Sequence, residues 1–195
     1  MKKKSLIKFL KNKKIKKDFF YKNKKIIIEI GCGTGENLLH LSRKYPKNKI
    51  IGIEPFKNGL ANIAHRCLEE KIKNVYLFPN IFEQFSKLYK NYKFSKCFVF
   101  FPDPWPKKRH HKRRLINHYF INEILRHCSS RGSIFFGTDN VHYFEEVKKI
   151  VKKIKKINYK ILKKKHKIKK KYNKIKLKIK NNVKYLKIDK TSIIV

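Results

Sequence analysis

Four acidic side chains have the type and the position that chemistry needs: Glu29, Glu54, Asp103 and Asp139. Acidic residues are scarce here, since the 195-residue chain has 13 of them against 53 Lys and Arg, a formal net charge of +40. Each of the four lies at or just after the end of a short apolar run. A carboxylate accepts hydrogen bonds and balances positive charge, so these residues could orient a ligand or stabilise charge that develops during a reaction.

The elements that must position these carboxylates alternate along the chain. Apolar runs typical of strands cover Lys25–Ile30, Lys49–Glu54, Asn74–Phe78, Ser95–Phe101 and Ser133–Gly137. Helical spacing appears between and after them, at Glu36–Tyr45, Phe56–Lys71, Ile81–Tyr89, Arg113–His127 and Val141–Ile154. Such alternation predicts an α/β fold with a mostly parallel sheet and helices on both faces. The four carboxylates then share the edge where open α/β sheets bind ligands.

The end of the chain differs in pattern. The segment "IKLKIKNNVKYLKI" alternates, turns at Asn181-Asn182 and alternates again, which predicts a C-terminal antiparallel hairpin with Lys on its solvated face. The length fits one domain with a sizeable core. We expect residues 1–24 to be a basic N-terminal extension and residues 25–195 to be a single domain.

The first loop, "EIGCGTGEN", supplies glycines 31, 33 and 35 (Gly31, Gly33, Gly35), which allow a tight turn and close approach to a ligand. A dinucleotide fingerprint would need glycine where the chain has Glu36. Negative charge from Glu29 and Glu36 opposes a pyrophosphate and suits a cationic ligand such as S-adenosylmethionine. Glu54 follows about twenty residues later, where its carboxylate could accept both ribose hydroxyls. The competing interpretation is a glycine turn beside a solvent-facing Glu.

The stretch "CFVFFPDPWPKKRHHKRRL" places Asp103 between two prolines that fix the backbone after a strand. We expect Asp103 to be held rigidly over the site, where it could accept the N1–H and amino group of guanine. Trp105 offers a surface on which a base could stack. A phosphate-binding edge at the start of a helix is predicted for Lys107, Lys108, Arg109, Lys112, Arg113 and Arg114. His110 and His111 are interpreted as phosphate contacts or solvent-facing groups, and the alternative is a plain turn before a solvated basic helix.

Composition limits the function classes. A charge of +40 favours polyanions and nucleic acid first, although only seven of the 53 cations are Arg, which also fits A+T-rich coding. The cysteines (Cys32, Cys67, Cys97, Cys128) form no CxxC and have no His at metal-ligand spacing, so we expect free thiols and no metal. No signal peptide, transit peptide or membrane-spanning run is apparent, and we expect a soluble, cytoplasmic protein.

Four segments together carry a family resemblance: "EIGCGTGENL", "IGIEPFKNGL", "FVFFPDPWPKKRHHKRRL" and "GSIFFGTDN". The chain resembles the bacterial tRNA (guanine-N7-)-methyltransferase family, of the TrmB type, over about residues 26 to 145. The resemblance implies a class I S-adenosylmethionine-dependent methyltransferase fold, Rossmann-like, with seven strands of which the seventh is antiparallel. It also implies S-adenosylmethionine bound through Glu29 and Glu54, and methylation of the guanine at position 46 in the variable loop of tRNA.

Carried over by position, the resemblance makes Asp103 the active-site carboxylate, also in contact with the cofactor, and Lys107 and Asp139 substrate contacts. Arg109, Arg113 and Tyr172 complete the expected substrate-binding set, and Asn80 the cofactor set. Asn80 replaces an Asp that the family uses to hold the adenine, yet its amide could still bond to the adenine amino group. The family's C-terminal Thr-x-Tyr/Phe-Glu motif aligns with Lys170-Lys171-Tyr172-Asn173, so the Thr and the Glu are missing.

Two other functions stay open. A methyltransferase acting on an exocyclic amine or another RNA base is one, although "PDPW" lacks the second consecutive proline and the tyrosine of the Asp-Pro-Pro-Tyr motif. A catalytically impaired tRNA-binding protein is the other, suggested by Lys170 and Asn173. The partner in every case is tRNA or other RNA. We expect a monomer or homodimer with no obligate protein partner.

Overall fold

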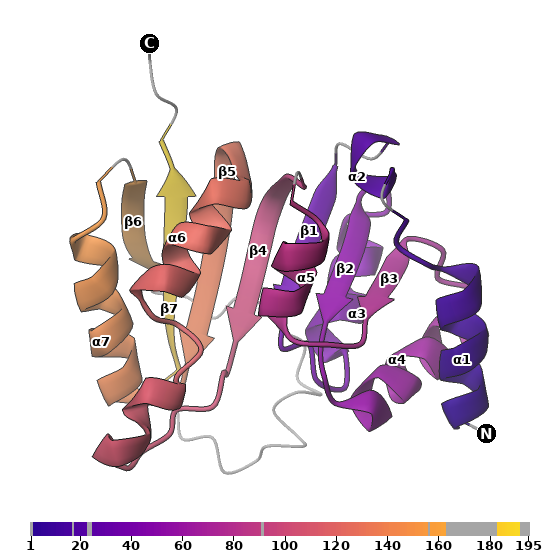
Figure 1. Ribbon diagram of the computed structural model, residues 1–195, viewed down its shortest axis with the longest axis horizontal. Helices are drawn as coiled ribbons and strands as arrows, with labels where there is room; N and C mark the ends of the chain where they lie inside the picture. The colour runs from indigo at the N-terminus through magenta and orange to yellow at the C-terminus, as the bar shows by residue number, and fades with distance from the viewer. Residues whose placement is uncertain are drawn as a thin grey trace. The chain divides into compact units, whose positions relative to one another are not determined.

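The structure is a computed structural model that describes residues 2–16, 18–22, 25–90, 92–155, 157–162 and 183–191. Its elements are α1 (Lys2–Asn12), α2 (Phe19–Lys22), β1 (Ile26–Ile30), α3 (Glu36–Lys44), β2 (Lys49–Ile53), α4 (Lys57–Glu69), β3 (Val75–Phe78), α5 (Phe82–Leu88), β4 (Phe94–Phe100), the 3₁₀ helix η1 (Lys108–Arg113), α6 (His118–His127), β5 (Cys128–Thr138), α7 (Val141–Lys152), β6 (Ile157–Leu162) and β7 (Lys184–Lys190). The seven strands have the order β3-β2-β1-β4-β5-β7-β6 (Figure 1). Contacts divide the chain into two compact units, residues 1–97 and 98–195.

The first unit is built on parallel strands. β1 pairs with β2, where Glu29 lies opposite Gly52, and β2 pairs with β3. All five residues of β1 are buried, which requires cover on both faces of the sheet and is typical of a parallel strand. The Ile-rich sequence of β1 and β2 satisfies this requirement, since β-branched side chains pack well on a pleated surface.

The N-terminal segment of the same unit is helical, which the sequence analysis did not predict. α1 packs against α4 and buries Leu6 and Phe9. The connection to β1 is also held, because the Tyr89 hydroxyl donates to the Ile15 carbonyl at 2.8 Å. The basic residues of α1 therefore belong to a helix with one apolar face on the unit.

The second unit ends in antiparallel strands. β7 pairs antiparallel with both β5 and β6, so the mixed sheet with antiparallel C-terminal strands is confirmed. Besides β5, β7 pairs with β6, a strand that the sequence analysis did not predict. The expected first hairpin arm and its Asn181-Asn182 turn lie outside the described residues, as does Tyr172.

Element boundaries differ from expectation in one place that matters for the site. The helix expected from Arg113 begins only at His118, where the Asn117 side chain accepts from the Phe120 amide as an N-cap. The basic run before it forms the 3₁₀ helix η1 instead. The four cysteines are buried and form no disulfide, as expected. Among the helices of the described ranges, none combines the length and the apolar character needed to cross a bilayer.

Candidate functional site

The glycine loop after β1 adopts the backbone that only glycine takes easily. Gly31, Gly33 and Gly35 have φ angles of +72°, +52° and +87°. Among the described residues, a Cβ at Gly31 or Gly33 would meet no atom within 4 Å, so this part of the chain leaves space over both. At Gly35 a Cβ would come within 2.3 Å of the Ile63 side chain on α4. The first two glycines thus leave room for a ligand, and the third allows close packing of the loop on α4.

Gly59, on α4, also supports the glycine loop, and the sequence analysis missed it. A Cβ at Gly59 would lie 2.3 Å from the carbonyl oxygen of Gly33. Its backbone position on α4 therefore sets how closely the helix approaches the loop. The only sequence signal is a glycine inside a helical pattern, which usually weakens a helix and so calls for a packing reason.

Glu54 holds the glycine loop directly. Its Oε2 accepts from the Gly33 amide at 2.8 Å, and its Oε1 accepts from the Phe56 amide at 2.9 Å. The side chain is buried with the rest of the residue. Each carboxylate oxygen has a second lone pair, so Glu54 can still accept from a ligand. The sequence analysis expected a ribose contact and did not foresee this loop-holding contact.

Glu29 lies on β1, which pairs with β2, the strand that Glu54 follows. Its side chain is buried. Its Oε2 has no hydrogen-bond partner among the described residues, and neither has Nδ2 of the neighbouring Asn37. Burial raises the pKa of Glu29 to about 8; the Asn37 amide lowers it and the Glu54 carboxylate raises it further. A buried acceptor without a partner is costly, and here it points to a ligand that brings a cationic donor. Asn37 was also missed, because an Asn in the first turn of a helix is ordinary.

Asn80 follows β3 and is exposed. Its Oδ1 accepts from the Ile81 amide at 2.8 Å, at the start of α5. The second lone pair of that oxygen and the amide nitrogen are the groups that could meet an adenine. Within the first unit the structure therefore brings Glu29, Glu54 and the glycine loop together, and places Asn80 at the end of the next strand.

Asp103 lies in a strained turn of the second unit. Phe101 and Trp105, on either side of it, have φ angles of +52° and +42°, which non-glycine residues rarely adopt. The Phe101 amide donates to the Gly137 carbonyl at 2.8 Å, which ties the turn to β5. The Asp103 side chain itself is exposed. Asp139, in the turn after β5, is exposed two residues beyond Gly137, so both expected carboxylates follow neighbouring strands.

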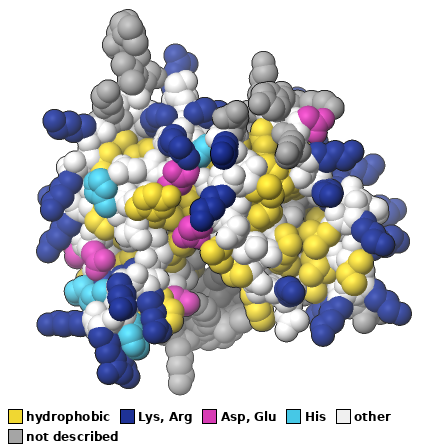
Figure 2. Space-filling view, viewed as in Figure 1, with side chains coloured by type: hydrophobic (Ala, Val, Ile, Leu, Met, Phe, Trp, Pro, Cys, Tyr) yellow, Lys and Arg dark blue, Asp and Glu magenta, His cyan; other side chains and the backbone are white. Residues whose placement is uncertain are grey.

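The basic segment after Asp103 is exposed at Lys107, Arg109 and Arg113. The Arg113 guanidinium lies 5.1 Å from the centre of the Trp105 ring, and the His110 ring meets that Trp edge-on at 5.8 Å. The tryptophan expected to receive a base is thus already in contact with two side chains. Figure 2 shows Lys and Arg spread over this face of the molecule, so total charge does not single out one element.

Arg114 corrects the expectation that the whole run binds phosphate. Its side chain is only 2% exposed and its Nη1 contacts the Glu146 carboxylate. The sequence run could not show this, because the acidic partner lies 32 residues later, on α7.

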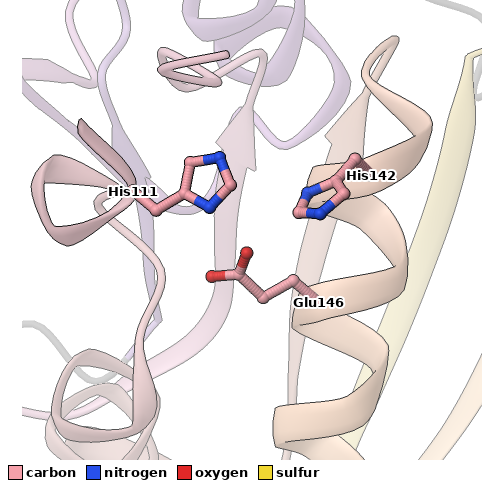
Figure 3. A group of neighbouring side chains, drawn as sticks. All are labelled: His111, His142 and Glu146. Atoms are coloured by element: carbon pink, nitrogen blue, oxygen red, sulfur yellow. The ribbon is translucent and has the colours of Figure 1, made fainter. Parts of the chain in front are cut away.

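His111, His142 and Glu146 are turned toward one another, with one potential ligand atom from each within 4.8 Å of the others (Figure 3). Side chains of these types bind transition metals. However, the Arg114 guanidinium contacts the Glu146 carboxylate and lies 3.2 Å from Nδ1 of His142. A divalent ion on those atoms would have to displace a buried guanidinium, so Arg114 is the cation that this group holds.

Comparison with solved structures supports the fold. A rRNA methylase from Streptococcus thermophilus matches with a TM-score of 0.61 at 12% identity, over 86% of this chain and 87% of that chain. The plantazolicin methyltransferase BpumL, solved with a monoazolic desmethylPZN analogue and SAH, matches with a TM-score of 0.58 at 13% identity, over 96% of this chain and 85% of that chain. At identities this low, the structural match establishes only a shared fold, that of class I methyltransferases.

Sequence comparison is more specific. Residues 23–193 match the family described as "Putative methyltransferase". The tRNA (guanine-N(7)-)-methyltransferase of Wolbachia pipientis is 31% identical over 165 residues, 85% of this chain and 75% of that protein. The enzyme of the same name from Nitrosococcus oceani is 35% identical over 128 residues, 65% of this chain and 54% of that protein. A Rickettsia bellii protein named "Bifunctional methyltransferase" is 33% identical over 134 residues, 69% of this chain but 24% of its own length.

The chain thus spans about half, or less, of several relatives that it matches, and three quarters of the Wolbachia protein. The expected resemblance is confirmed by both the family match and the named relatives. This protein belongs to the tRNA (guanine-N7-)-methyltransferase family.

Proposed function

We propose that the protein transfers the methyl group of S-adenosylmethionine to N7 of the variable-loop guanine, position 46, of tRNA. The observation that carries the proposal is the exposed carboxylate of Asp103, held in a strained turn and followed at once by exposed cations. Such a turn persists only where the surrounding structure maintains it, and strain of this kind clusters at functional sites.

The first unit has the groups to hold the cofactor. The unpartnered Oε2 of buried Glu29 matches the amino group of S-adenosylmethionine, and Glu54 has lone pairs left for the ribose hydroxyls. The space that the described residues leave over Gly31 and Gly33 would admit the ligand close to the loop backbone. When bound, the cofactor supplies an electrophilic methyl group on a sulfonium. Asn80 is assigned to the adenine.

Asp103 is assigned to the substrate base. Guanine N7 carries an exposed lone pair, so its methylation needs no general base and depends mainly on orientation. The methylated base is cationic, and a nearby carboxylate stabilises that charge as it develops. Asp103 can also accept from the guanine N1–H and amino group, a donor pair that adenine lacks. Recognition and catalysis thus use the same side chain.

Lys107, Arg109, Arg113 and Asp139 are assigned to the tRNA. The three cations are exposed and lie within ten residues of Asp103, where phosphate contacts would fix the register of the RNA. Tyr172 is kept as a substrate contact on the family resemblance alone. The replaced Thr and Glu positions, Lys170 and Asn173, favour one second candidate, a tRNA binder with impaired transfer.

The test is methyl transfer from labelled S-adenosylmethionine to an unmodified tRNA transcript, with the product guanine located by borohydride and aniline cleavage. A matched transcript with 7-deazaguanine at position 46 lacks the reacting nitrogen and should take up no label. Label that persists on the deaza transcript would assign the enzyme to another base. Binding of both ligands without transfer would identify the impaired binder.

A further inference from the structure

Arg114 is the one cation of the basic segment around Asp103 that the fold buries among the described residues. Its side chain is 2% exposed, whereas those of Lys107, Arg109 and Arg113 belong to exposed residues. Burying a guanidinium is costly unless an anion and several acceptors compensate for the lost water. The partners of the Arg114 guanidinium, which replace the lost water, therefore indicate the role of this side chain.

One side of the Arg114 guanidinium is fixed to α7. Nη1 contacts the Glu146 carboxylate and lies 3.2 Å from His142 Nδ1, and the guanidinium lies 4.9 Å from the centre of the buried Tyr143 ring. Arg only donates, so Nδ1 of His142 is the acceptor of this hydrogen bond. In Figure 3, His142 and Glu146 project from the same helix face toward His111.

The other side of Arg114 holds the loop. Nε donates to the carbonyl oxygen of Pro104 at 2.8 Å. Pro104 directly follows Asp103 and directly precedes Trp105, one of the two residues of this turn with positive φ. A non-glycine residue in that region is strained and persists only when other contacts maintain it. The Phe101–Gly137 hydrogen bond secures the turn before Asp103, and the Pro104–Arg114 hydrogen bond secures it after Asp103.

We propose that Arg114 is a positioning residue for Asp103: it clamps the Pro104 carbonyl to Glu146 and His142 of α7 and so fixes the direction of the Asp103 carboxylate. The inference rests on the proposed function for its catalytic consequence. The clamp needs the forked geometry of Arg, because one side chain must reach a backbone carbonyl and a carboxylate at the same time.

Arg114→Lys tests the clamp with little change in charge. The ammonium can still pair with Glu146, but a lysine has no nitrogen at the Nε position and leaves the Pro104 carbonyl without its donor. The matched control is Arg126→Lys. Arg126 also contacts a Glu and a His, at 2.6 Å from Glu123 and 3.3 Å from Nε2 of His127, but its side chain is 64% exposed, against 2% for Arg114.

Trp105 provides a direct readout, since it is the only tryptophan of the chain. Its fluorescence therefore reports on this loop alone, in the free protein and without any substrate. We expect acrylamide quenching of Trp105 to increase at least twofold in Arg114→Lys and to stay unchanged in Arg126→Lys. Unchanged quenching in Arg114→Lys would overturn the clamp whatever the enzyme does.

The catalytic consequence is measured by single-turnover methylation of tRNA. Arg114→Lys should lower the rate at saturating substrates at least tenfold while the KM for tRNA and the affinity for S-adenosylmethionine change less than twofold. Combined with Asp103→Asn, it should add less than a twofold further loss, because it acts through Asp103. Full additivity would show a merely structural effect and overturn the inference, as would a normal rate in a variant with a loosened Trp105.

A second variant covers the case in which Arg114→Lys folds poorly. Glu146→Gln keeps the side-chain shape and an acceptor oxygen but weakens the anchor, so it should shift Trp105 quenching and the rate in the same directions by a smaller factor. A parent protein that methylates no tRNA would refute the proposed function, and the quenching comparison would still decide whether Arg114 holds the loop.

Discussion

Replacing Glu29 by Gln should make the protein more stable at alkaline pH. Burial raises the pKa of Glu29 to about 8 from a reference value of 4.5. Between these values the unfolded chain has released the proton and the native protein keeps it. Native Glu29 must ionise as the pH passes its folded pKa, so its unfavourable contribution grows from pH 4.5 upward and is complete above pH 8.

The magnitude follows from the size of this difference. At about 1.4 kcal/mol for each pKa unit, the parent should lose roughly 5 kcal/mol of unfolding free energy between pH 4.5 and pH 8 through this group. Glu29→Gln has no proton to release and loses none. We therefore expect similar stabilities near pH 5 and an advantage of several kcal/mol for the variant at pH 8.5.

Urea unfolding of both proteins at pH 5, 6, 7, 8 and 8.5 measures this difference. Titrating groups that do not interact with Glu29 affect both chains equally, so the difference between the two curves reports on Glu29 and its coupling to Glu54 and Cys32. Parallel stability curves for parent and variant would refute the claim that burial raises the pKa of the Glu29 carboxyl. The same variant should bind S-adenosylmethionine more weakly, since a neutral amide cannot balance the ligand's ammonium group.

Three further perturbations address other parts of the site. Glu54→Gln should weaken S-adenosylmethionine binding by roughly 1.5–3 kcal/mol, the scale of hydrogen bonds to a charged group, as calorimetry would measure; unchanged affinity would remove Glu54 from the cofactor site. Gly59→Ala should cost about 1–3 kcal/mol of unfolding free energy, because its Cβ would press on the Gly33 carbonyl; a neutral effect in denaturation would show that the loop yields freely. Replacing Lys107, Arg109 and Arg113 by Gln should weaken tRNA binding and reduce the slope of log K against log salt by roughly 2 to 3. The control is the same change at Lys149, Lys152 and Lys153, which are exposed at the end of α7 and should matter less. Equal losses from both sets would mean that bulk charge determines binding.

Much of the fold could be predicted because its cause is local. The runs that became β1 and β2 are Ile-rich and bounded by glycine or charged residues, and the structure ends each within one residue of the expected position. The glycines of the first loop likewise indicate a backbone conformation with positive φ, which other residues avoid. Alternation of strands with helices predicts that Glu29 and Glu54 each lie at or just after the end of a strand, as the structure shows.

The features that were missed depend on contacts distant in sequence. β6 is half exposed and gains its strand character from pairing with β7, far along the chain. Arg114 is chemically identical to its neighbours in the basic run, and only Glu146 and Pro104 make it a buried clamp. Gly59 matters because α4 passes close to the Gly33 carbonyl. None of these relations has a signature in spacing or composition.

The most direct test of the central claim is single-turnover methylation by Asp103→Asn. The change keeps the shape of the side chain, replaces one acceptor oxygen with a donor and removes the charge that would balance the cationic base. We expect the rate on unmodified tRNA to fall by at least ~100-fold, comparable to the loss of one preorganised electrostatic group, with cofactor affinity unchanged and tRNA binding nearly so. Methylation of the same guanine at the parent rate would contradict the account and leave Asp103 as a residue that only shapes its turn.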